Sequence, residues 1–318
     1  MHGPAGGAAR KENNWTAAAE RPGRKMAGRQ RRGVRQRKQA GSDKVAGQGE
    51  NSMKKVILMT IRRTEQLADG IYRTVLHAPE GDGFGTMMPG QFLGIYPNDP
   101  AALLPRPISL CRQDPGTGDL VIVYRTAGRG TLELATQSAG STVRVLGALG
   151  NGYDLSRFRG KRVLLLGGGI GIPPMLELAA RLAGESGTAK QVTAVLGYRS
   201  SDFFLLEEFR KTADRVLIAT DDGSAGTHGT VLDAVREDGT AFDIVAACGP
   251  MPMLRGVKQF AEERGTEAFL SLEERMACGV GVCLGCVCRT VNRDDHSKVN
   301  NARVCTEGPV FLASEVDI

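Results

Sequence analysis

The feature that most constrains the fold of this chain is a group of cysteines near its C-terminus. Five of the seven cysteines lie between Cys278 and Cys305, whereas Cys111 and Cys248 stand alone. The surrounding stretch, residues 266–318, is rich in cysteine and glycine and is too short to form a hydrophobic core by itself. A small secreted domain stabilised by disulfides would have its cysteines spread along the sequence. Clustering in one segment instead predicts a metal centre in a reducing compartment.

The spacing inside this group narrows the kind of metal centre. Cys278 and Cys283 are separated by four residues, Cys283 and Cys286 by two, and Cys305 follows later. This is the plant-type spacing of a [2Fe–2S] centre, in which each ferric ion binds two bridging sulfides and two protein sulfurs. Structural zinc usually has two Cys-x2-Cys pairs and this segment has one, so zinc is the competing interpretation and inert buried thiols are a third. Cys288 falls outside the spacing, and we expect it to pack in the interior.

Upstream of the cysteines the chain is long enough for two ordinary domains. From residue 53 to residue 154, short apolar runs are separated by clusters of Gly, Pro, Asp and Asn. That punctuation is typical of a small antiparallel β-barrel. The expected strands include residues 71–76, 91–96, 120–124 and 143–146.

From residue 155 to residue 265 the pattern changes to strands alternating with helices, which is typical of a doubly wound parallel sheet. The expected strands are residues 163–166, 192–198, 216–220 and 244–248. The expected helices are residues 173–183, 202–212, 231–236 and 251–264. The sequence therefore predicts a multi-domain α+β protein with an antiparallel barrel, a doubly wound α/β domain and a small C-terminal cluster domain at residues 266–318.

A glycine-rich loop directly follows the first expected strand of the α/β region. Its residues are Gly167, Gly168, Gly169, Ile170 and Gly171. Such a loop can bring backbone N–H groups and a helix N-terminus to a pyrophosphate, although a tight structural turn could have the same composition. Its place between a strand and a helix favours a nucleotide site. The loop does not have the Gly-x-Gly-x-x-Gly fingerprint, so no acidic ribose-binding residue is assigned from it.

A third group of motifs lies inside the β region. They are Arg106-Pro107-Ile108-Ser109, Val123-Tyr124-Arg125 and Gly130-Thr131. An arginine can pair with a diphosphate through two hydrogen bonds, a serine hydroxyl can hydrogen-bond a flavin ring, and a Gly-Thr turn can offer backbone N–H donors. Each motif alone is also consistent with an ordinary strand that carries a surface arginine.

The basic charge of the chain is concentrated in its first 52 residues. These contain 12 Lys and Arg against 4 Asp and Glu, whereas the rest contains 29 basic and 31 acidic side chains. Residues 1–52 have no apolar periodicity and no secretory h-region, which predicts a disordered tail or an over-extended start before Met53. A nucleic-acid-binding arm is the alternative. No stretch approaches the roughly 20 apolar residues that cross a bilayer, so we expect no membrane partner.

Together these motifs resemble the ferredoxin–NADP reductase superfamily and, more narrowly, the family of electron transfer subunits of dihydroorotate dehydrogenase B. The resemblance extends from residue 53 to the C-terminus. Its most specific stretches are Pro89-Gly90-Gln91-Phe92, Arg106–Ser109, Leu149-Gly150-Asn151-Gly152, Gly167–Gly171, Cys248-Gly249-Pro250-Met251, Glu274–Gly279 and Cys305–Phe311. The wider superfamily often has an aromatic residue where this chain has Ile108, and this departure agrees with the subunit family.

The resemblance implies three cofactor regions. FAD is expected in residues 53–154, at Arg106, Pro107, Ile108, Ser109, Val123, Tyr124, Arg125, Gly130 and Thr131. NAD is expected in residues 155–265, at the loop 167–171 and at Gly249 and Pro250. Cys248 is expected near the nicotinamide as a catalytic residue, the alternative being a buried strand cysteine. The [2Fe–2S] ligands are expected to be Cys278, Cys283, Cys286 and Cys305.

The resemblance also implies a function in pyrimidine biosynthesis. Dihydroorotate would be oxidised on an FMN-containing catalytic subunit, in a cytoplasmic heterotetramer with two copies of each subunit. Electrons would pass through the [2Fe–2S] cluster and FAD to NAD⁺, because clusters carry one electron and nicotinamide carries two. The sequence leaves the choice of NAD or NADP open, with Arg199 as a candidate 2′-phosphate partner.

Two other classes of protein remain as alternatives. One is a subunit of a sulfide dehydrogenase or ferredoxin:NADP oxidoreductase complex, which would share the barrel, the nucleotide domain and the cluster. The Glu274–Gly279 stretch and the Cys305–Phe311 ending favour the dihydroorotate dehydrogenase family over it. The other is a binding module with a structural zinc in the cysteine segment and nucleic acid on the basic tail.

Overall fold

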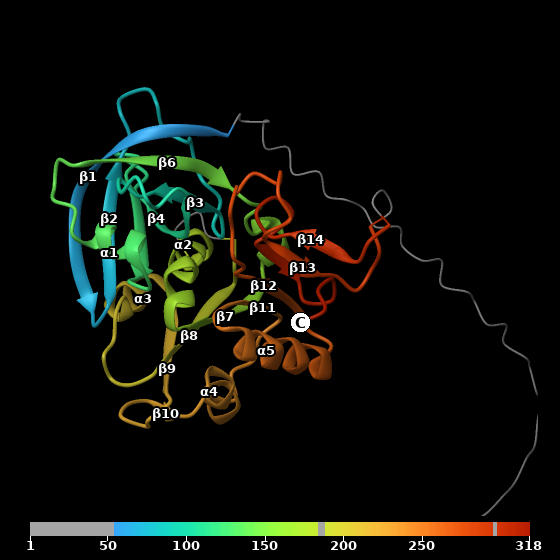
Figure 1. Cartoon of the computed structure of the whole chain (residues 1–318). Coiled ribbons are helices and arrows are strands. Elements are labelled where there is room, and N and C mark those ends of the chain that lie inside the picture. Colours follow the sequence, from blue (N-terminus) through green and yellow to red (C-terminus); the bar gives the residue numbers. More distant parts are fainter. Residues whose placement is uncertain (1–53, 184–187, 295–297) are drawn as a thin grey trace, which may run out of the picture. The chain divides into compact units, whose positions relative to one another are not determined.

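A computed structural model describes residues 54–183, 188–294 and 298–318 (Figure 1). The expected tail at residues 1–52 and the expected start at Met53 lie outside the described residues. In the part of the chain that is described, no helix is both long and apolar enough to span a bilayer.

Six antiparallel strands close into a barrel in the order β1-β2-β5-β4-β3-β6. They are β1 (Lys55–Ala68), β2 (Ile71–His77), β3 (Phe92–Tyr96), β4 (Arg106–Gln113), β5 (Leu120–Arg125) and β6 (Thr142–Leu149), with the helix α1 (Arg129–Ala135) between β5 and β6. Alternate residues of a strand face the interior, and Ile57, Met59 and Ile61 of β1 are accordingly buried. The predicted antiparallel barrel is confirmed.

A seven-stranded sheet forms the second half of the described chain, in the order β10-β9-β8-β7-β11-β12-β15. Every neighbouring pair is parallel except β12 with β15. The strands are β7 (Arg162–Gly168), β8 (Gln191–Tyr198), β9 (Arg215–Thr220), β10 (Thr227–His228), β11 (Ile244–Cys248), β12 (Glu267–Ser271) and β15 (Val310–Leu312). The helices are α2 (Ile172–Ala183), α3 (Leu206–Thr212), α4 (Val231–Asp238) and α5 (Met251–Arg264), and the 3-10 turns are η1 (Leu155–Phe158) and η2 (Gly169–Gly171).

Helices cover both faces of this sheet. Along β7, Leu164 and Leu166 pack in one core with residues of α4 and α5. Val163 and Leu165 point the other way and pack with residues of α2 and α3. This alternation confirms the doubly wound arrangement. The second core also contains Val123 of the barrel strand β5, so the barrel and the sheet share buried side chains.

The helix expected at residues 202–212 is shorter than predicted. α3 begins at Leu206, because the preceding residues form a turn in which the Tyr198 hydroxyl donates a hydrogen bond of 2.8 Å to the Phe204 carbonyl. Leu205 then has a left-handed φ of 62°, which is incompatible with a continuous helix. The two Phe rings before α3 pack edge-on against Tyr198.

The sheet continues beyond residue 265, where the cluster region was expected to begin. β12 pairs with β11 in parallel, and β15 pairs with β12 in the antiparallel direction. The described parts of residues 272–309 therefore leave the sheet after β12 and return to it at β15. They contain a two-stranded sheet of β13 (Val287–Arg289) and β14 (Asn301–Arg303).

Candidate functional site

The glycine loop and the Cys-Gly-Pro stretch lie side by side at one edge of the sheet. Gly167, the last residue but one of β7, lies opposite Cys248 at the end of β11 in the parallel register. From β7 the chain continues through α2 to β8 on one side, whereas β11 lies on the other side. Such a reversal of strand order leaves a crevice outside the carboxyl ends of the strands, where nucleotides bind in open α/β sheets. The structure thus places Gly167–Gly171 with Cys248, Gly249 and Pro250.

Two glycines of the loop are required by the local backbone. A Cβ on Gly171 would lie 2.2 Å from the Cys248 carbonyl oxygen, so no larger residue fits between the two loops. Gly169 has a φ of +53°, a conformation that side chains disfavour. Ile170 is partly buried against the neighbouring core and anchors the turn. The loop therefore presents bare backbone just before α2, as phosphate binding requires.

Cys248 is partly exposed at the end of β11 and shares a hydrogen bond with the side chain of Ser271. Burial of the thiol raises the pKa of Cys248 to about 12, although the Ser271 hydrogen bond acts in the opposite direction. The thiol is therefore protonated at neutral pH. It can orient or contact a ligand as a neutral group, but it is not a thiolate nucleophile.

In the barrel, the structure brings Arg106 and Gly130 together. The Arg106 guanidinium donates a hydrogen bond of 2.7 Å to the Leu104 carbonyl. A Cβ on Gly130 would lie 2.7 Å from Arg106 Nε, so glycine is needed for this approach. The Thr131 hydroxyl accepts a hydrogen bond from the Ala127 N–H at the start of α1, so it holds the helix end in place.

Several residues of the expected flavin motif face the barrel interior. Ile108 and Tyr124 are buried in the barrel core, and Val123 is buried between the barrel and the sheet. The Tyr124 hydroxyl lies 3.1 Å from the Thr74 hydroxyl, and burial raises the pKa of Tyr124 to about 12. Only the backbone of these three residues is available to a cofactor at the surface. Ser109 has the opposite orientation and is partly exposed.

Arg125 connects the barrel motif with the glycine loop. It is exposed at the end of β5, and its Nη2 lies 3.7 Å from the position that a Cβ on Gly169 would occupy. Arg125 forms no ion pair with any residue in the described ranges. An unpaired guanidinium beside bare backbone N–H groups is well suited to an anionic ligand.

The four expected cluster ligands form two pairs of thiols. In the first pair, Cys278 Sγ and Cys283 Sγ are 3.4 Å apart. The N–H groups of Val280 and Cys283 donate to Cys278 Sγ at 3.5 and 3.4 Å. Desolvation raises the pKa of Cys278, but these backbone hydrogen bonds outweigh it and lower the pKa to about 6. The loop therefore favours a thiolate at this position.

The second pair, Cys286 and Cys305, is buried, and the two thiols are hydrogen-bonded to each other. Burial, followed by the hydrogen bond with Cys286, raises the pKa of Cys305 to about 11. Within the described ranges, no three or more His, Cys, Asp or Glu side chains surround one metal position. Two pairs of thiols fit a centre with two irons, each of which takes two protein sulfurs, better than they fit one zinc ion.

Cys288 lies apart from these pairs. It belongs to β13, where it pairs with Ala302 of β14. Burial raises the pKa of its thiol to about 11. Its position agrees with the packing role expected from the spacing.

The two most exposed large apolar side chains in the cluster loop flank Cys283. Val282 is 84% exposed and Leu284 is 74% exposed. Apolar residues that stay exposed next to functional groups often mark an interaction surface.

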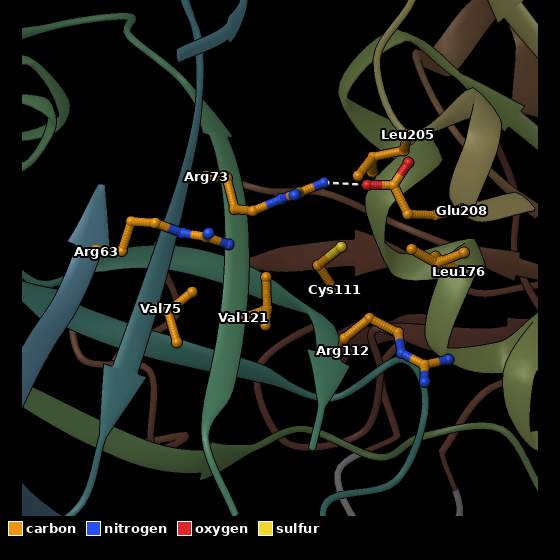
Figure 2. A pocket seen from close by; sticks show the side chains of 9 residues that line it. All are labelled: Arg63, Arg73, Val75, Cys111, Arg112, Val121, Leu176, Leu205 and Glu208. Carbon is orange, nitrogen blue, oxygen red and sulfur yellow. Dashed lines mark hydrogen bonds and ion pairs between the residues drawn. The ribbon is translucent and has the colours of Figure 1, made fainter. Parts of the chain in front are cut away.

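A separate cavity of about 180 Å³ lies between the barrel and the helices α2 and α3 (Figure 2). Arg63, Arg73 and Arg112 surround it, and Arg73 forms an ion pair across it with Glu208 (Figure 2). None of the expected site residues lines this cavity. Its charges hold the barrel and the helices together, and it does not coincide with the crevice at the sheet edge.

Sequence reasoning gave no role to Asn151, which joins the barrel to the cluster segment, or to Gln91, which bonds the residue before Asn151. Asn151 donates hydrogen bonds to the segment that follows Cys305, and Gln91 donates one to Gly150. Both residues lie within stretches of sequence that are specific to the family. Their partners are distant in the sequence, so no local spacing could have identified the contacts.

Comparisons with known proteins support these regions. Residues 273–317 match the family model described as the iron-sulfur cluster binding domain of dihydroorotate dehydrogenase B, and residues 165–259 match the oxidoreductase NAD-binding domain. The chain is 42% identical over 260 residues to the dihydroorotate dehydrogenase B (NAD(+)) electron transfer subunit of Geobacillus sp. (strain WCH70), covering 81% of this chain and 97% of that one. It is 41% identical over 262 residues to the subunit of the same name from Listeria monocytogenes serotype 4a (strain HCC23), covering 82% and 98%.

Solved structures show the same architecture. The structure of the NADH-dependent reduced ferredoxin-NADP oxidoreductase superposes with a TM-score of 0.71 at 30% identity, covering 82% of this chain and 90% of that one. Phthalate dioxygenase reductase superposes with a TM-score of 0.54 at 19% identity, covering 79% and 94%, which shows a shared fold alone.

Proposed function

Because the chain belongs to the family of electron transfer subunits of NAD⁺-linked dihydroorotate dehydrogenase B, we propose that it passes electrons from a partner catalytic subunit to NAD⁺. The observation that carries this proposal is the arrangement of four thiols in two pairs within the segment that matches the cluster-binding family. A donor set of this kind fits a two-iron cluster. When bound, the cluster and FAD would supply the conversion between single electrons and the hydride that NAD carries.

We place FAD on the barrel, residues 53–154. Arg106, held beside Gly130, is positioned to bind the diphosphate, and the partly exposed Ser109 to hydrogen-bond the flavin ring. Pro107, Ile108, Val123, Tyr124 and Thr131 would shape this site through their backbone, since the side chains of most of them are buried or engaged in the fold. Arg125 would bind an anionic group between the barrel and the sheet.

We place NAD in residues 155–265, at the crevice where β7 and β11 end. The bare backbone of Gly167–Gly171 would bind its pyrophosphate, and Gly249 and Pro250 would form the opposite wall. Cys248 would lie beside the nicotinamide as a protonated thiol that orients the ring.

We place the cluster in residues 266–318, with Cys278 and Cys283 on one iron and Cys286 and Cys305 on the other. The N–H groups that donate to Cys278 would stabilise its thiolate and tune the potential of the site. β12 and β15 would anchor this region in the nucleotide sheet.

The partner in this proposal is an FMN-containing dihydroorotate dehydrogenase subunit, assembled with this chain as a heterotetramer with two copies of each. The exposed Val282 and Leu284 beside Cys283 support docking at the cluster loop, because an electron has to enter near the cluster. We further propose that the complex works in the cytoplasm during pyrimidine biosynthesis. None of the seven cysteines, all of which lie in the described ranges, forms a disulfide, which supports a reducing compartment.

A reduced ferredoxin–NADP oxidoreductase is the second candidate, since a structure of that kind superposes well. The curated subunits of dihydroorotate dehydrogenase B are more similar, at 41–42% against 30% identity. The matched cluster family also carries the dihydroorotate dehydrogenase name. These comparisons favour the first function over this candidate and over a zinc- and nucleic-acid-binding module.

The deciding experiment is a dihydroorotate:NAD⁺ assay with the chain alone and with the FMN-containing subunit from the same source. The chain alone should oxidise NADH with artificial acceptors but should not oxidise dihydroorotate. The histidines in the described ranges offer no base at the cofactor sites, because His77 pairs with Asp119 and His228 is exposed on β10. Dihydroorotate turnover by the chain alone would contradict the proposal, and no turnover with the partner would favour the ferredoxin–NADP candidate.

A further inference from the structure

Asn151 joins the end of the barrel to the backbone that follows the cluster ligand Cys305. Its side-chain Nδ2 donates to the Thr306 carbonyl at 3.0 Å and to the Glu307 carbonyl at 3.2 Å. Its backbone N–H donates to the Gly308 carbonyl at 2.6 Å. Asn151 is itself exposed, so hydrogen bonds and not packing account for its position. A single residue thus holds three consecutive carbonyls of the cluster segment.

Gln91 continues this connection into the flavin barrel. Its Nε2 donates to the Gly150 carbonyl at 2.9 Å, directly before Asn151. Its Oε1 accepts from the Met88 N–H at 2.8 Å, so both ends of the amide are engaged. The Gln91 backbone carbonyl accepts from the Leu110 N–H at 3.0 Å. Leu110 follows Ser109, so the hydrogen bonds lead from the cluster segment to the proposed flavin strand β4.

The backbone around this connection is closely packed. Gly150 has a φ of +72°, and a Cβ there would lie 2.6 Å from Pro309 Cδ. Phe92, next to Gln91, pairs across the sheet with Ser109 and lies in the same buried core as Cys286 and Cys305. The hydrogen bonds of Asn151 and Gln91 therefore run alongside apolar contacts between the barrel and the cluster segment. Close packing leaves little room for the two proposed cofactor regions to move relative to each other.

We propose that Asn151 and Gln91 are positioning residues that fix the [2Fe–2S] segment against the flavin strand and thereby set the rate of electron transfer between the two cofactors. In the proposed function one electron at a time would leave the reduced cluster and enter the flavin, with no bond formed or broken between them, and NADH would drive the same transfer in reverse. Neither side chain needs to touch a cofactor. The inference rests on the proposed function, because it requires both FAD and the cluster.

The test uses two substitutions that keep the shape of the side chain and remove its donor. Asn151→Asp loses both Nδ2 hydrogen bonds and places a carboxylate against carbonyl oxygens. Gln91→Glu loses the bond to Gly150 but can still accept from Met88. Gln66→Glu is the matched control, because Gln66 Nε2 also donates to a backbone carbonyl, that of Ala68 at 3.1 Å, within β1. This strand pairs with β2 and β6, and not with the flavin strand β4 or the described cluster segment.

Each purified protein is mixed rapidly with NADH without oxygen, and flavin bleaching and cluster reduction are followed separately. Both variants should bleach the flavin at the wild-type rate and reduce the cluster several-fold more slowly, because the rate of electron transfer falls with the distance between the two cofactors. The control should match the wild type in both phases. Amide hydrogen exchange at Asn151, whose N–H is bonded to Gly308, should accelerate in both variants.

The outcomes separate this inference from the proposed function. Wild-type rates of cluster reduction in both variants, with unchanged iron and FAD, would overturn the inference and leave the function standing. A wild-type protein without iron or FAD would overturn both. If Asn151→Asp releases the cluster, Gln91→Glu decides alone, because the Gln91 side chain donates to Gly150 and not to the cluster segment.

Discussion

The buried carboxylate of Glu177 should stabilise the contact between the barrel and the nucleotide helix α2. Glu177 is 2% exposed, and its Oε2 accepts a hydrogen bond of 3.2 Å from the Gln113 N–H at the end of β4. Arg112 Nε lies 3.6 Å from the same oxygen, and Arg181 Nη1 lies 3.5 Å from Oε1. Both arginine side chains are more than a third exposed, so solvent screens these ion pairs to at most ~1 kcal/mol each.

Two substitutions separate the hydrogen bond from the charge. Glu177→Gln keeps an acceptor for Gln113 and should change the stability by less than about 1 kcal/mol, because the loss of the screened ion pairs is offset by the relief of burying a charge. Glu177→Ala leaves the Gln113 N–H without its acceptor, at about 1–3 kcal/mol, and removes buried packing as well. We therefore expect a total loss of roughly 2–4 kcal/mol for the alanine variant.

The assay is urea unfolding of the cofactor-loaded protein, with Glu207→Ala as the control. Glu207 lies on α3 with its side chain 67% exposed, and its loss should change stability by no more than about 0.5 kcal/mol. The urea midpoint should change little in Glu177→Gln and should fall clearly in Glu177→Ala. An alanine variant that unfolds at the wild-type urea concentration would refute the reasoning.

The pH dependence of this group has a defined sign. Burial raises the pKa of Glu177 above its ordinary value, against the lowering effect of the Gln113 N–H and of Arg112. Its titration therefore favours the folded state most below its unfolded pKa, and this advantage is lost as the pH rises through the folded pKa. Relative to Glu177→Gln, the wild type should therefore be most stable below the unfolded pKa of Glu177. It should lose this advantage as the pH rises through the folded pKa.

Three further predictions concern the cofactor sites. Serine in place of any one cluster ligand, Cys278, Cys283, Cys286 or Cys305, should abolish iron and sulfide binding, whereas Cys288→Ser should keep both. Iron retained in a ligand variant and lost in Cys288→Ser would contradict the assignment. Cys248→Ala should slow hydride transfer from NADH. Because burial holds the pKa of the Cys248 thiol at about 12, the pH profile of the wild-type rate should show no ionisation of this thiol between about pH 6 and pH 10. An ionisation in that range that disappears in the variant would contradict this. Gly171→Ala should raise the KM for NADH at least tenfold, or about 1.4 kcal/mol, because its Cβ would meet the Cys248 carbonyl at 2.2 Å; an unchanged KM would show that the loop does not bind the nucleotide.

Much of the fold could be predicted because its signals are local. The strand at Ile244–Cys248 and the helix at Met251–Arg264 have the predicted bounds, since apolar runs and Gly or Pro punctuation define them. The place of β12 and β15 in the sheet could not be read in this way. Strand order depends on pairing between distant segments, and the cysteine-rich composition gave no sign that two short strands complete this end of the sheet.

The site was predictable in its residue types but not in its orientations. The cysteine spacing is a local signal, and the structure brings the four thiols together in two pairs. The flavin motif was carried over as continuous stretches, although neighbouring strand residues face opposite sides of the barrel. Tyr124 therefore faces the core while Arg125 is exposed. The Asn151 contact with Thr306 joins residues 155 positions apart, which no spacing rule anticipates.

The pairing of β12 with β15 has a consequence for the length of the cluster loop. Ser271 lies opposite Val310 in the antiparallel register, so the cluster segment leaves and re-enters the sheet at neighbouring points, as the loop of a hairpin does. Lengthening a loop whose ends are already fixed costs only about 0.6 kcal/mol for each doubling. The pairing of β12 with β15 can therefore persist when the cluster loop changes in length, because the sheet itself fixes the two ends of the loop.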